Sequence, residues 1–373
     1  MDVLVYLPNL MKNSGGAEVY GLWIAKVLSK TFSVKILTIP RIKEDDIENI
    51  FLKYGINNLS VLKLGKKRPQ FSYRIEQKRR EYLVNDYLKH NKCDLFINCG
   101  FNKMICRNCR NSIHIIHFPA ALSKSIFGRK HDEQYIKSYN EFVANSEFTK
   151  KHLDQMYHIR SLVIHPPVTM SSIVSDELKR KENIILAVDR IVEEKKILEM
   201  IKTFECIHRK IHNNFKFVIV GNKDDSEINY YKTVIKEIKG YPIEIHTDVS
   251  YEELISWYKK SKIFWHAKGY GVSEENPHLM EHFGMTTVEA MTNGCIPVVI
   301  NKAGQKEIMK NGLESLTWNT LEELKVKTID LIEAEERISE LQSVVIKEAE
   351  QYQIPQFATQ INNIVNKVMN DWN

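Results

Sequence analysis

The chain has 373 residues, of which 43% are hydrophobic and 27% are charged. These values are typical of a soluble globular protein with two domains. No apolar run reaches the ~18 residues that a membrane-spanning helix needs, and a net charge of +6 is too mild to predict nucleic-acid binding. The apolar start (MDVLVYLPNL) lacks a basic region and a cleavage site, so we expect a buried first strand and a cytoplasmic protein.

Positive charge gathers in residues 66–80 (KKRPQFSYRIEQKRR), where seven basic residues face one glutamate. A basic segment that also holds aromatic residues suits an anionic membrane surface. A solvated helix face without a partner is the alternative. The membrane interpretation assigns the contact to Lys66, Lys67, Arg68, Arg74, Lys78, Arg79 and Arg80.

Short apolar runs alternate with longer amphipathic segments in the first half of the chain. Short strands that are apolar throughout, separated by helical segments, indicate a parallel sheet covered on both faces. The predicted helix is 17–30, and the predicted strands are 3–7, 34–39, 94–99, 113–118 and 141–145.

Pro166 and Pro167 interrupt this pattern, because adjacent prolines neither continue a helix nor pair inside a sheet. We expect the connection between domains over 164–183, where a polar stretch follows the prolines. The alternation then restarts. Strands are predicted at 184–188, 215–221, 243–246, 263–267 and 297–300, and helices at about 195–212, through 238, at 251–261 and at 286–293.

We therefore predict an α/β protein of two Rossmann-like, doubly wound domains that face each other across a cleft. The first domain covers residues 1–166 and the second covers 167–352. An amphipathic helix within 353–373 is expected to cross back onto the first domain.

The segment 281–289 holds the densest set of candidate binding residues. Gly284 precedes a predicted helix, so the backbone can approach a ligand while unpaired N–H groups at the helix start attract an anion. Glu281 lies before this loop and Glu289 lies inside the helix. Thr286 and Glu289 also have the spacing of a capping box, which is a purely structural alternative.

The same segment matches a zinc-protease pattern, His278-x-x-Glu281-His282. That site requires a continuous helix, which Pro277 and Gly284 oppose. Cys106 and Cys109 form one CxxC pair, but a zinc site needs further ligands. We therefore expect no metal site.

Arg190 and Lys195 follow the predicted strand 184–188, at the edge of the sheet where ligands bind. Two cations across a strand-to-helix loop can clamp a diphosphate. Glu193 and Glu194 could instead pair with both cations, which is the structural alternative.

The first domain offers two weaker candidates. Gly15-Gly16 lies between the first strand and the first helix, but it is not a dinucleotide fingerprint. His117 lies at the end of the strand 113–118 and is expected to project toward the cleft. No DxD motif occurs in the chain, and Arg190 and Lys195 could balance the charge of a leaving group without a metal.

Taken together, these residues resemble a retaining glycosyltransferase of family 4, with the GT-B fold. The family's E-x7-E signature matches Glu281 and Glu289, and its R-x4-K pair matches Arg190 and Lys195. The stretch from WHAKGYG to NKAGQKE (265–307) is similar to the branch that adds α-1,2-mannose to dolichol-linked oligosaccharides. The chain departs from the pattern at Asp189 and Lys196, where family members often carry glycine.

The resemblance implies that a nucleotide-diphosphate sugar binds mainly to the second domain. The implied catalytic residues are Glu281 on the sugar hydroxyls, Arg190 and Lys195 on the diphosphate, and His117 on the acceptor side. The other implied contacts are Glu289 with the ribose, Gly16 with the diphosphate, the backbone at Phe283, Gly284, Met285 and Thr286 with the sugar or phosphate, and Gly221 and Val249 with the base.

The implied reaction moves a hexose from GDP-mannose or a UDP-sugar to a glycan acceptor, with retention at the anomeric carbon and no metal or other cofactor. We expect a lipid-linked acceptor, a protein bound peripherally to the anionic inner face of a membrane, and no nucleic-acid partner. Two alternatives stay open. One is a soluble sugar or polysaccharide acceptor, and the other is a nucleotide- or glycan-binding protein without turnover.

Overall fold

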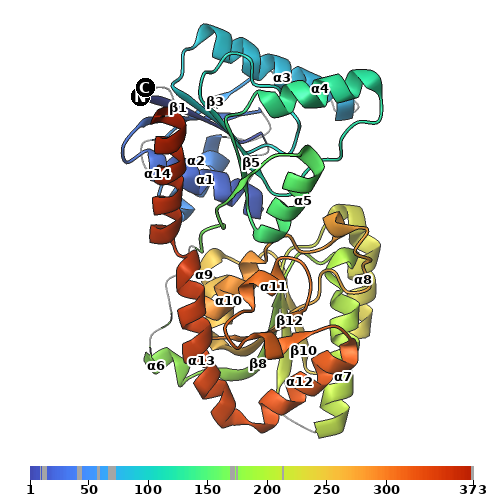
Figure 1. Cartoon of the computed structure of the whole chain (residues 1–373). Helices are drawn as coiled ribbons and strands as arrows, with labels where there is room; N and C mark the ends of the chain where they lie inside the picture. The colour runs from blue at the N-terminus through green and yellow to red at the C-terminus, as the bar shows by residue number, and fades with distance from the viewer. Residues whose placement is uncertain are drawn as a thin grey trace. The chain divides into compact units, whose positions relative to one another are not determined.

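The chain divides into two compact units in its computed structural model (Figure 1). Unit 1 comprises Met1–Pro167 and Ile354–Asn373, and unit 2 comprises Val168–Gln353. The expected connection over 164–183 is wrong beyond Pro167, because Val168 and the short helix α6 (Ser175–Leu178) already belong to unit 2. The structure describes residues 1–8, 10, 15–39, 44–56, 59–65, 73–168, 173, 175–211 and 214–370.

Unit 1 is built on a seven-stranded sheet in the order β3-β2-β1-β4-β5-β6-β7, and every neighbouring pair is parallel. Its central strands are buried on both faces, as the adjacent residues Leu4 and Val5 of β1 show, which is why their sequences contain unbroken apolar runs. The strands are β1 (Asp2–Tyr6), β2 (Ser33–Thr38), β3 (Ser60–Lys63), β4 (Leu95–Asn98), β5 (Ser112–Ile116), β6 (Glu141–Ala144) and β7 (Leu162–Val163).

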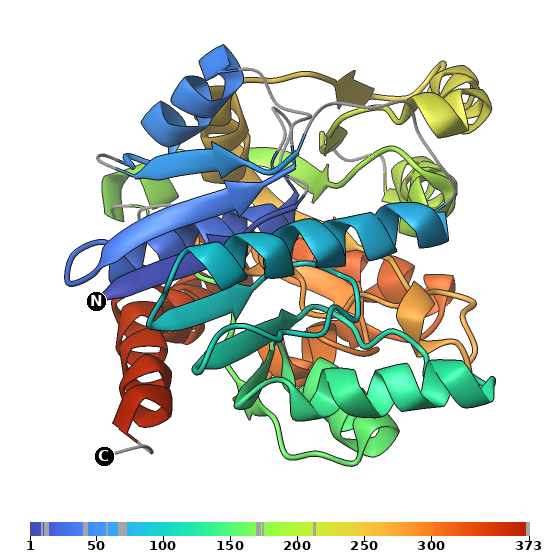
Figure 2. The same ribbon diagram turned by 90° about the horizontal axis from the view of Figure 1, so that it is seen from above.

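Helices cover this sheet, and the last helix of the chain is one of them. Phe357 of α14 packs edge-on against Tyr20 of α1, with ring centroids 5.3 Å apart. Figure 2 shows α3 and α4 running beside each other, where His131 pairs with Glu81 at 3.3 Å. The helices are α1 (Gly16–Leu28), α2 (Glu44–Lys53), α3 (Tyr73–His90), α4 (Ile126–Lys137), α5 (Glu147–Tyr157) and α14 (Ile354–Asn370).

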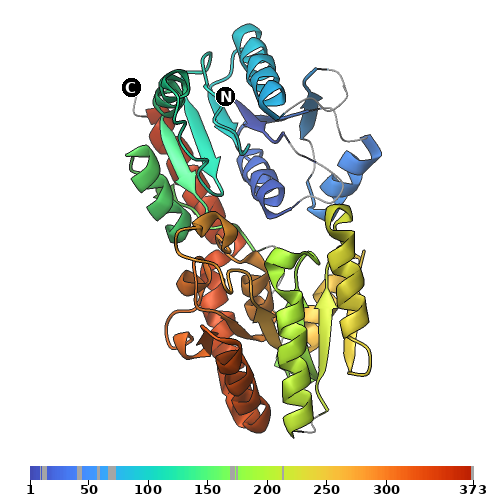
Figure 3. The same cartoon turned by 90° about the vertical axis from the view of Figure 1, so that its right-hand side faces the viewer.

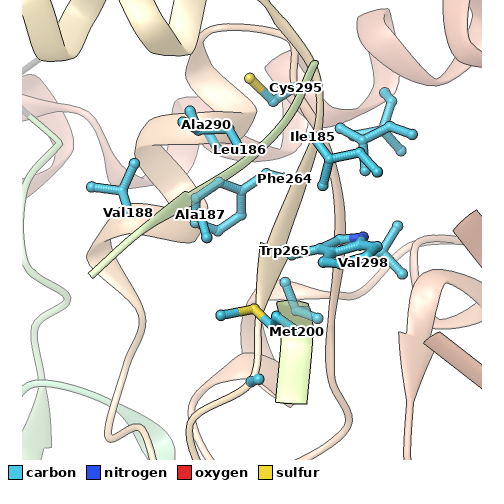
Figure 4. Close-up of a cluster of buried hydrophobic side chains, with 14 of the residues drawn as sticks. Ile185, Leu186, Ala187, Val188, Met200, Phe264, Trp265, Ala290, Cys295 and Val298 are labelled. Atoms are coloured by element: carbon cyan, nitrogen blue, oxygen red, sulfur yellow. The ribbon is translucent and has the colours of Figure 1, made fainter. Parts of the chain in front are cut away.

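Unit 2 is built on a six-stranded parallel sheet in the order β10-β9-β8-β11-β12-β13. Its core gathers the side chains of β8 and β11, among them Leu186 and Trp265, which Figure 4 shows close up. The strands are β8 (Glu182–Val188), β9 (Lys216–Val220), β10 (Ile243–His246), β11 (Ser261–His266), β12 (Ile296–Ile300) and β13 (Thr317–Trp318).

The helices of unit 2 lie over both faces of this sheet. Helix α7 (Ile197–Ile211) packs against helix α12 (Leu321–Glu333), as Figure 3 shows. The described part of the chain contains no helix that is long and apolar enough to cross a membrane. The longer helices are α7 (Ile197–Ile211), α8 (Ile228–Glu237), α9 (Tyr251–Lys260), α10 (Met285–Thr292), α12 (Leu321–Glu333) and α13 (Glu335–Ala349); α11 (Gln305–Ile308) and the one-turn 3-10 helices η1 (Glu193–Lys195), η2 (Asp225–Glu227), η3 (Pro277–Leu279), η4 (Glu314–Leu316) and η5 (Glu350–Tyr352) are shorter.

The prediction of two doubly wound α/β domains is confirmed. In each sheet the strand order reverses once, between β1 and β4 in unit 1 and between β8 and β11 in unit 2. Ligands of such folds bind outside the carboxyl ends of the strands at this switch point. A ligand of unit 2 is therefore expected to bind beside the residues that follow β8 and β11.

Candidate functional site

A cluster of four titratable side chains lies at the switch point of unit 2. Lys195 lies with its ammonium 2.5 Å from Oδ1 of Asp189 and 2.9 Å from Oε2 of Glu281. His266, the last residue of β11, has its Nε2 3.3 Å from Oε2 of Glu281 and 3.7 Å from Oδ2 of Asp189. The structure thus joins two residues of the predicted site, Lys195 and Glu281, that are 86 positions apart.

The backbone around β8 explains how Asp189 and Lys195 reach this position. At Gly221, just after β9, an added Cβ would lie 1.7 Å from the carbonyl oxygen of Asp189, so only glycine lets the two strand ends approach this closely. Lys196 ends η1 with a φ of 59°, in the left-handed region that favours glycine. Lys196 therefore adopts a glycine-like conformation at the position where the resemblance leads us to expect glycine.

The cluster holds Glu281 and Lys195 in their charged forms. Burial by itself raises the pKa of the Glu281 carboxyl, but Lys195, followed by His266, outweighs burial and holds this pKa well below its usual range. Burial lowers the pKa of the Lys195 ammonium, but Asp189 and Glu281 outweigh it and raise this pKa above its usual range. Glu281 is therefore a hydrogen-bond acceptor at neutral pH and not a proton donor.

Arg190 lies at the more open side of the same loop. Its guanidinium pairs with Asp224 at 3.2 Å and with Glu194 at 3.4 Å, and its side chain is 60% exposed. The alternative in which nearby glutamates pair with the two cations therefore holds for Glu194 and Arg190. Lys195 instead takes Asp189 and Glu281 as its partners.

The loop before α10 packs tightly against the start of α11. Gly284 is the N-cap residue of α10 with a φ of 115°, and an added Cβ would lie 2.6 Å from Nε2 of Gln305. Gly304 donates its N–H to the carbonyl of Glu281 at 2.9 Å. Together these contacts fix the backbone that leads from Glu281 into the helix and aim the first N–H groups of α10 outward from its N-terminus.

Two alternative interpretations of this segment are wrong. Thr286 is the second residue of α10 and Gly284 is its cap, so Thr286 and Glu289 do not form a capping box. The zinc-protease pattern does not lie in a continuous helix, because η3 covers only Pro277–Leu279 and Met280 is extended. Among the described residues, no group of three His, Cys, Asp or Glu side chains could hold a metal ion.

The remaining predicted contacts of unit 2 lie in or just before α10, just after β9 and just before α9. Glu289 accepts a hydrogen bond from the buried hydroxyl of Tyr258 at 2.9 Å, and its side chain shares a half-buried face of α10 with Met285 and Thr286. Phe283 is buried with its ring against Tyr352, so only its backbone is available to a ligand. Gly221 directly follows β9, and Val249 packs against the core just before α9.

The predicted residues of unit 1 lie at the carboxyl ends of β1 and β5. Gly16 is the first residue of α1, and Glu18 accepts a hydrogen bond from the backbone N–H of Gly15 at 3.1 Å. His117 follows β5 and packs against Tyr20 and Phe101, with ring centroids 5.6 and 5.5 Å away. The role of Gly16 toward the diphosphate and that of His117 on the acceptor side stay predictions.

The predicted membrane-contact residues differ in how exposed their side chains are. Lys66, Lys67, Arg68 and the side chain of Arg74 lie outside the described residues. Lys78 is exposed on α3. Arg79 is mostly buried and pairs with Glu76 at 3.4 Å. Arg80 is wrong as a membrane contact, because its side chain is buried and pairs with Glu76 at 3.3 Å.

Two functional candidates were missed in the sequence. His266 completes the buried cluster, and Lys268 lies two residues further on, with its ammonium 3.4 Å from Glu194. His266 is the last residue of β11 and Lys268 follows the predicted strand 263–267, so both lie at the carboxyl edge of the sheet. That position is the signal that could have found them.

Comparison with known proteins now defines the class. Residues 171–352, nearly the whole of unit 2, match the family model described as "Glycosyl transferases group 1". The crystal structure of a glycosyltransferase from Rickettsia africae ESF-5 covers 99% of this chain and of its own chain, with a TM-score of 0.77 and 16% identity. Unit 2 is a glycosyl transferases group 1 domain, and the chain has the GT-B fold.

Two curated relatives are more specific. The Alpha-1,3/1,6-mannosyltransferase ALG2 of Saccharomyces cerevisiae is 26% identical over 237 residues, which are 52% of this chain and 47% of ALG2. The GDP-Man:Man(3)GlcNAc(2)-PP-Dol alpha-1,2-mannosyltransferase of Neurospora crassa is 25% identical over 199 residues, 45% of this chain and 34% of that protein. The chain thus spans half or less of these relatives' length, and its resemblance to this family and branch is confirmed.

Proposed function

We propose that the chain is a retaining glycosyltransferase that moves a hexose from a nucleotide-diphosphate sugar to a glycan acceptor. The observation that carries the proposal is the cluster at the carboxyl ends of β8 and β11. It brings Lys195 and Glu281 together next to Arg190, inside a glycosyl transferases group 1 domain. The names of both relatives favour mannose as the hexose.

The charges of the cluster suit a diphosphate leaving group. Negative charge grows on the departing phosphate as the glycosidic bond breaks, and fixed cations aimed at that charge speed the step. The ammonium of Lys195 has three N–H groups and gives two of them to Asp189 and Glu281. The third remains for a phosphate oxygen, and Arg190 offers its exposed guanidinium beside it.

Glu281 binds the transferred sugar in this proposal. Its carboxylate is ionised at neutral pH, so it accepts hydrogen bonds from sugar hydroxyls and leaves the leaving group to the cations. Glu289, oriented by Tyr258, takes the ribose hydroxyls. The acceptor hydroxyl attacks from the face that the diphosphate leaves, and a departing phosphate oxygen takes its proton.

Substitution of Glu281 separates an enzyme from a binding protein without turnover. Glu281→Gln keeps the size of the side chain and one acceptor oxygen, and we expect sugar transfer to fall about 10²–10³-fold, as for the loss of one transition-state contact. Transfer of radiolabelled mannose from GDP-mannose, or of the sugar of a UDP-sugar, measures this effect. Folded wild-type protein that binds nucleotide but transfers no sugar to any glycan acceptor would refute the enzyme proposal.

We further propose that the acceptor is lipid-linked and that the protein binds an anionic membrane surface from the cytosolic side. The name of the Neurospora crassa relative supports a dolichol-linked acceptor, and Lys78 supplies an exposed positive charge on α3. A basic residue near anionic headgroups contributes about 1 kcal/mol, so Lys78→Glu should weaken binding to vesicles at least fivefold.

Flotation with phosphatidylserine vesicles measures that effect, and Lys89→Glu, exposed at the other end of α3, is the matched control. Equal flotation of the two variants would remove Lys78 from the membrane surface. Efficient transfer to a soluble oligosaccharide, with no vesicle binding by the wild type, would favour the soluble acceptor instead.

A further inference from the structure

A single carboxylate oxygen bridges two cations at the switch point of unit 2. Oε1 of Glu194 lies 3.4 Å from a terminal guanidinium nitrogen of Arg190 and 3.4 Å from the ammonium of Lys268. Arg190 follows β8 and Lys268 follows β11, which are neighbouring strands. The two cations thus converge on one point from two separate loops.

The cations of this region are fully balanced by carboxylates of the chain itself. Within the described residues, three cations face four carboxylates, so the set carries a charge of −1 when His266 is neutral. A diphosphate that binds Arg190 and Lys268 together must therefore take the place of the carboxylate that lies between them. The cations are Arg190, Lys195 and Lys268, and the carboxylates are Asp189, Glu194, Asp224 and Glu281.

Glu194 is the carboxylate that is best placed to leave. Its side chain is 37% exposed, against 6% for Asp189 and 19% for Glu281. It lies on the one-turn helix η1, and exposed ion pairs contribute little to stability. Asp189 and Glu281, in contrast, hold a buried ammonium, and the loss of such a pair is costly.

We propose that Lys268 is a third cation of the diphosphate site, and that Glu194 occupies the position of a phosphate oxygen until a nucleoside diphosphate displaces it. The inference rests on the nucleotide-sugar site proposed above. Carboxylate and phosphate oxygens accept charge-assisted hydrogen bonds from Arg and Lys in the same way, so one can replace the other between Arg190 and Lys268. Lys268 also contributes to the low pKa of Glu281, which agrees with a position close to the buried cluster.

The proposal predicts effects of opposite sign for two residues that form one ion pair. Lys268→Met removes a charge-assisted hydrogen bond to the diphosphate and should weaken nucleoside diphosphate binding about tenfold or more. Glu194→Gln removes the competing charge and should tighten binding about threefold to tenfold. If the pair only stabilised the fold, both variants would change binding in the same direction or leave it unchanged.

Isothermal titration of GDP and UDP into each variant tests this, with the corresponding nucleoside as a probe that lacks phosphates. Lys262 and Glu335 provide matched controls, because they form an ion pair at 2.5 Å at the opposite end of β11. We expect Lys262→Met and Glu335→Gln to bind the diphosphate as the wild type does. Lys268→Arg, which keeps the charge, should retain most of the affinity, and nucleoside binding should be the same in all variants.

The outcomes separate this inference from the function on which it rests. Wild-type protein that is folded but binds neither diphosphate contradicts the proposed function itself. Wild-type binding with an unchanged affinity in Lys268→Met removes Lys268 from the site and leaves the function standing. Weaker diphosphate binding in Glu194→Gln shows that Glu194 supports the site and does not hold the place of a phosphate.

Discussion

Replacing Lys195 by methionine should destabilise unit 2 more than any exposed lysine substitution does. The change leaves Asp189 and Glu281 as two buried carboxylates without their shared cation. Removing one partner of a buried ion pair costs about 3–5 kcal/mol. For a domain of about 150–250 residues, 1 kcal/mol corresponds to about 2–4 °C, so we expect a melting temperature about 10 °C lower at pH 7.

The pH dependence of this loss gives a sharper test. The pKa of Glu281 is lowered in the folded wild type, so its contribution is present above the unfolded value of about 4.3 and is lost as pH falls through the folded value. The pKa of Lys195 is raised, so its contribution is present below about 10.4 and is lost only as pH rises through the folded value. Between pH 5 and 9 these two contributions are constant.

The variant should behave differently over the same range. Without Lys195, burial favours the protonated form of Glu281, so the folded state binds this proton more tightly than the unfolded state and the variant gains stability as pH falls. Thermal melts of both proteins from pH 5 to 9 measure the difference, with Lys262→Met as the control that should lose less than about 1 kcal/mol. A Lys195→Met variant that melts within 2 °C of the wild type at pH 7, or loses stability toward pH 5, would refute this reasoning.

Two further predictions concern the supports of the site. Gly221→Ala places a Cβ against the carbonyl of Asp189; it should cost about 1–3 kcal/mol of stability and lower the nucleotide affinity. Gly240→Ala, where the Cβ meets open space but a φ of 90° adds backbone strain between α8 and β10, should lose stability and leave nucleotide titrations unchanged; equal affinities in both variants would contradict this expectation. Tyr258→Phe removes the hydrogen bond to Glu289 and should weaken nucleotide binding about fivefold, for a bond of about 1 kcal/mol; unaltered binding by calorimetry would show that Tyr258 does not orient the carboxylate.

The fold was predictable because its central strands contain unbroken apolar runs, such as 184–188 in β8. Strands such as β8 and β11 are buried on both faces, so their sequences stand out from the amphipathic helices around them. The edge strands β7 and β13 have two residues each and leave no such pattern, which is why they were not predicted. The expected connection between the domains extended too far along the chain, because polarity alone marked 175–183 as part of it.

The site was predictable residue by residue but not as a set of contacts. Charge and position after a strand predicted Arg190 and Lys195, and the resemblance to family 4 added the role of Glu281. The sharing of Lys195 between Asp189 and Glu281 depends on the order of β8 and β11 in the sheet, which the sequence does not display. Lys268 carried no signal beyond its place after a strand.

Unit 2 is proposed to bind the diphosphate of a nucleotide sugar without a metal. The most direct measurement is thermal unfolding of the wild type with GDP, UDP and ADP, each with and without EDTA, beside Arg190→Ala. A ligand at 100 times its dissociation constant stabilises by about 2.7 kcal/mol. We expect the nucleoside diphosphate of one base to raise the melting temperature by several degrees. EDTA should leave this rise unchanged, and Arg190→Ala should reduce it. No shift with any nucleotide, or a shift that EDTA abolishes, would contradict this proposal.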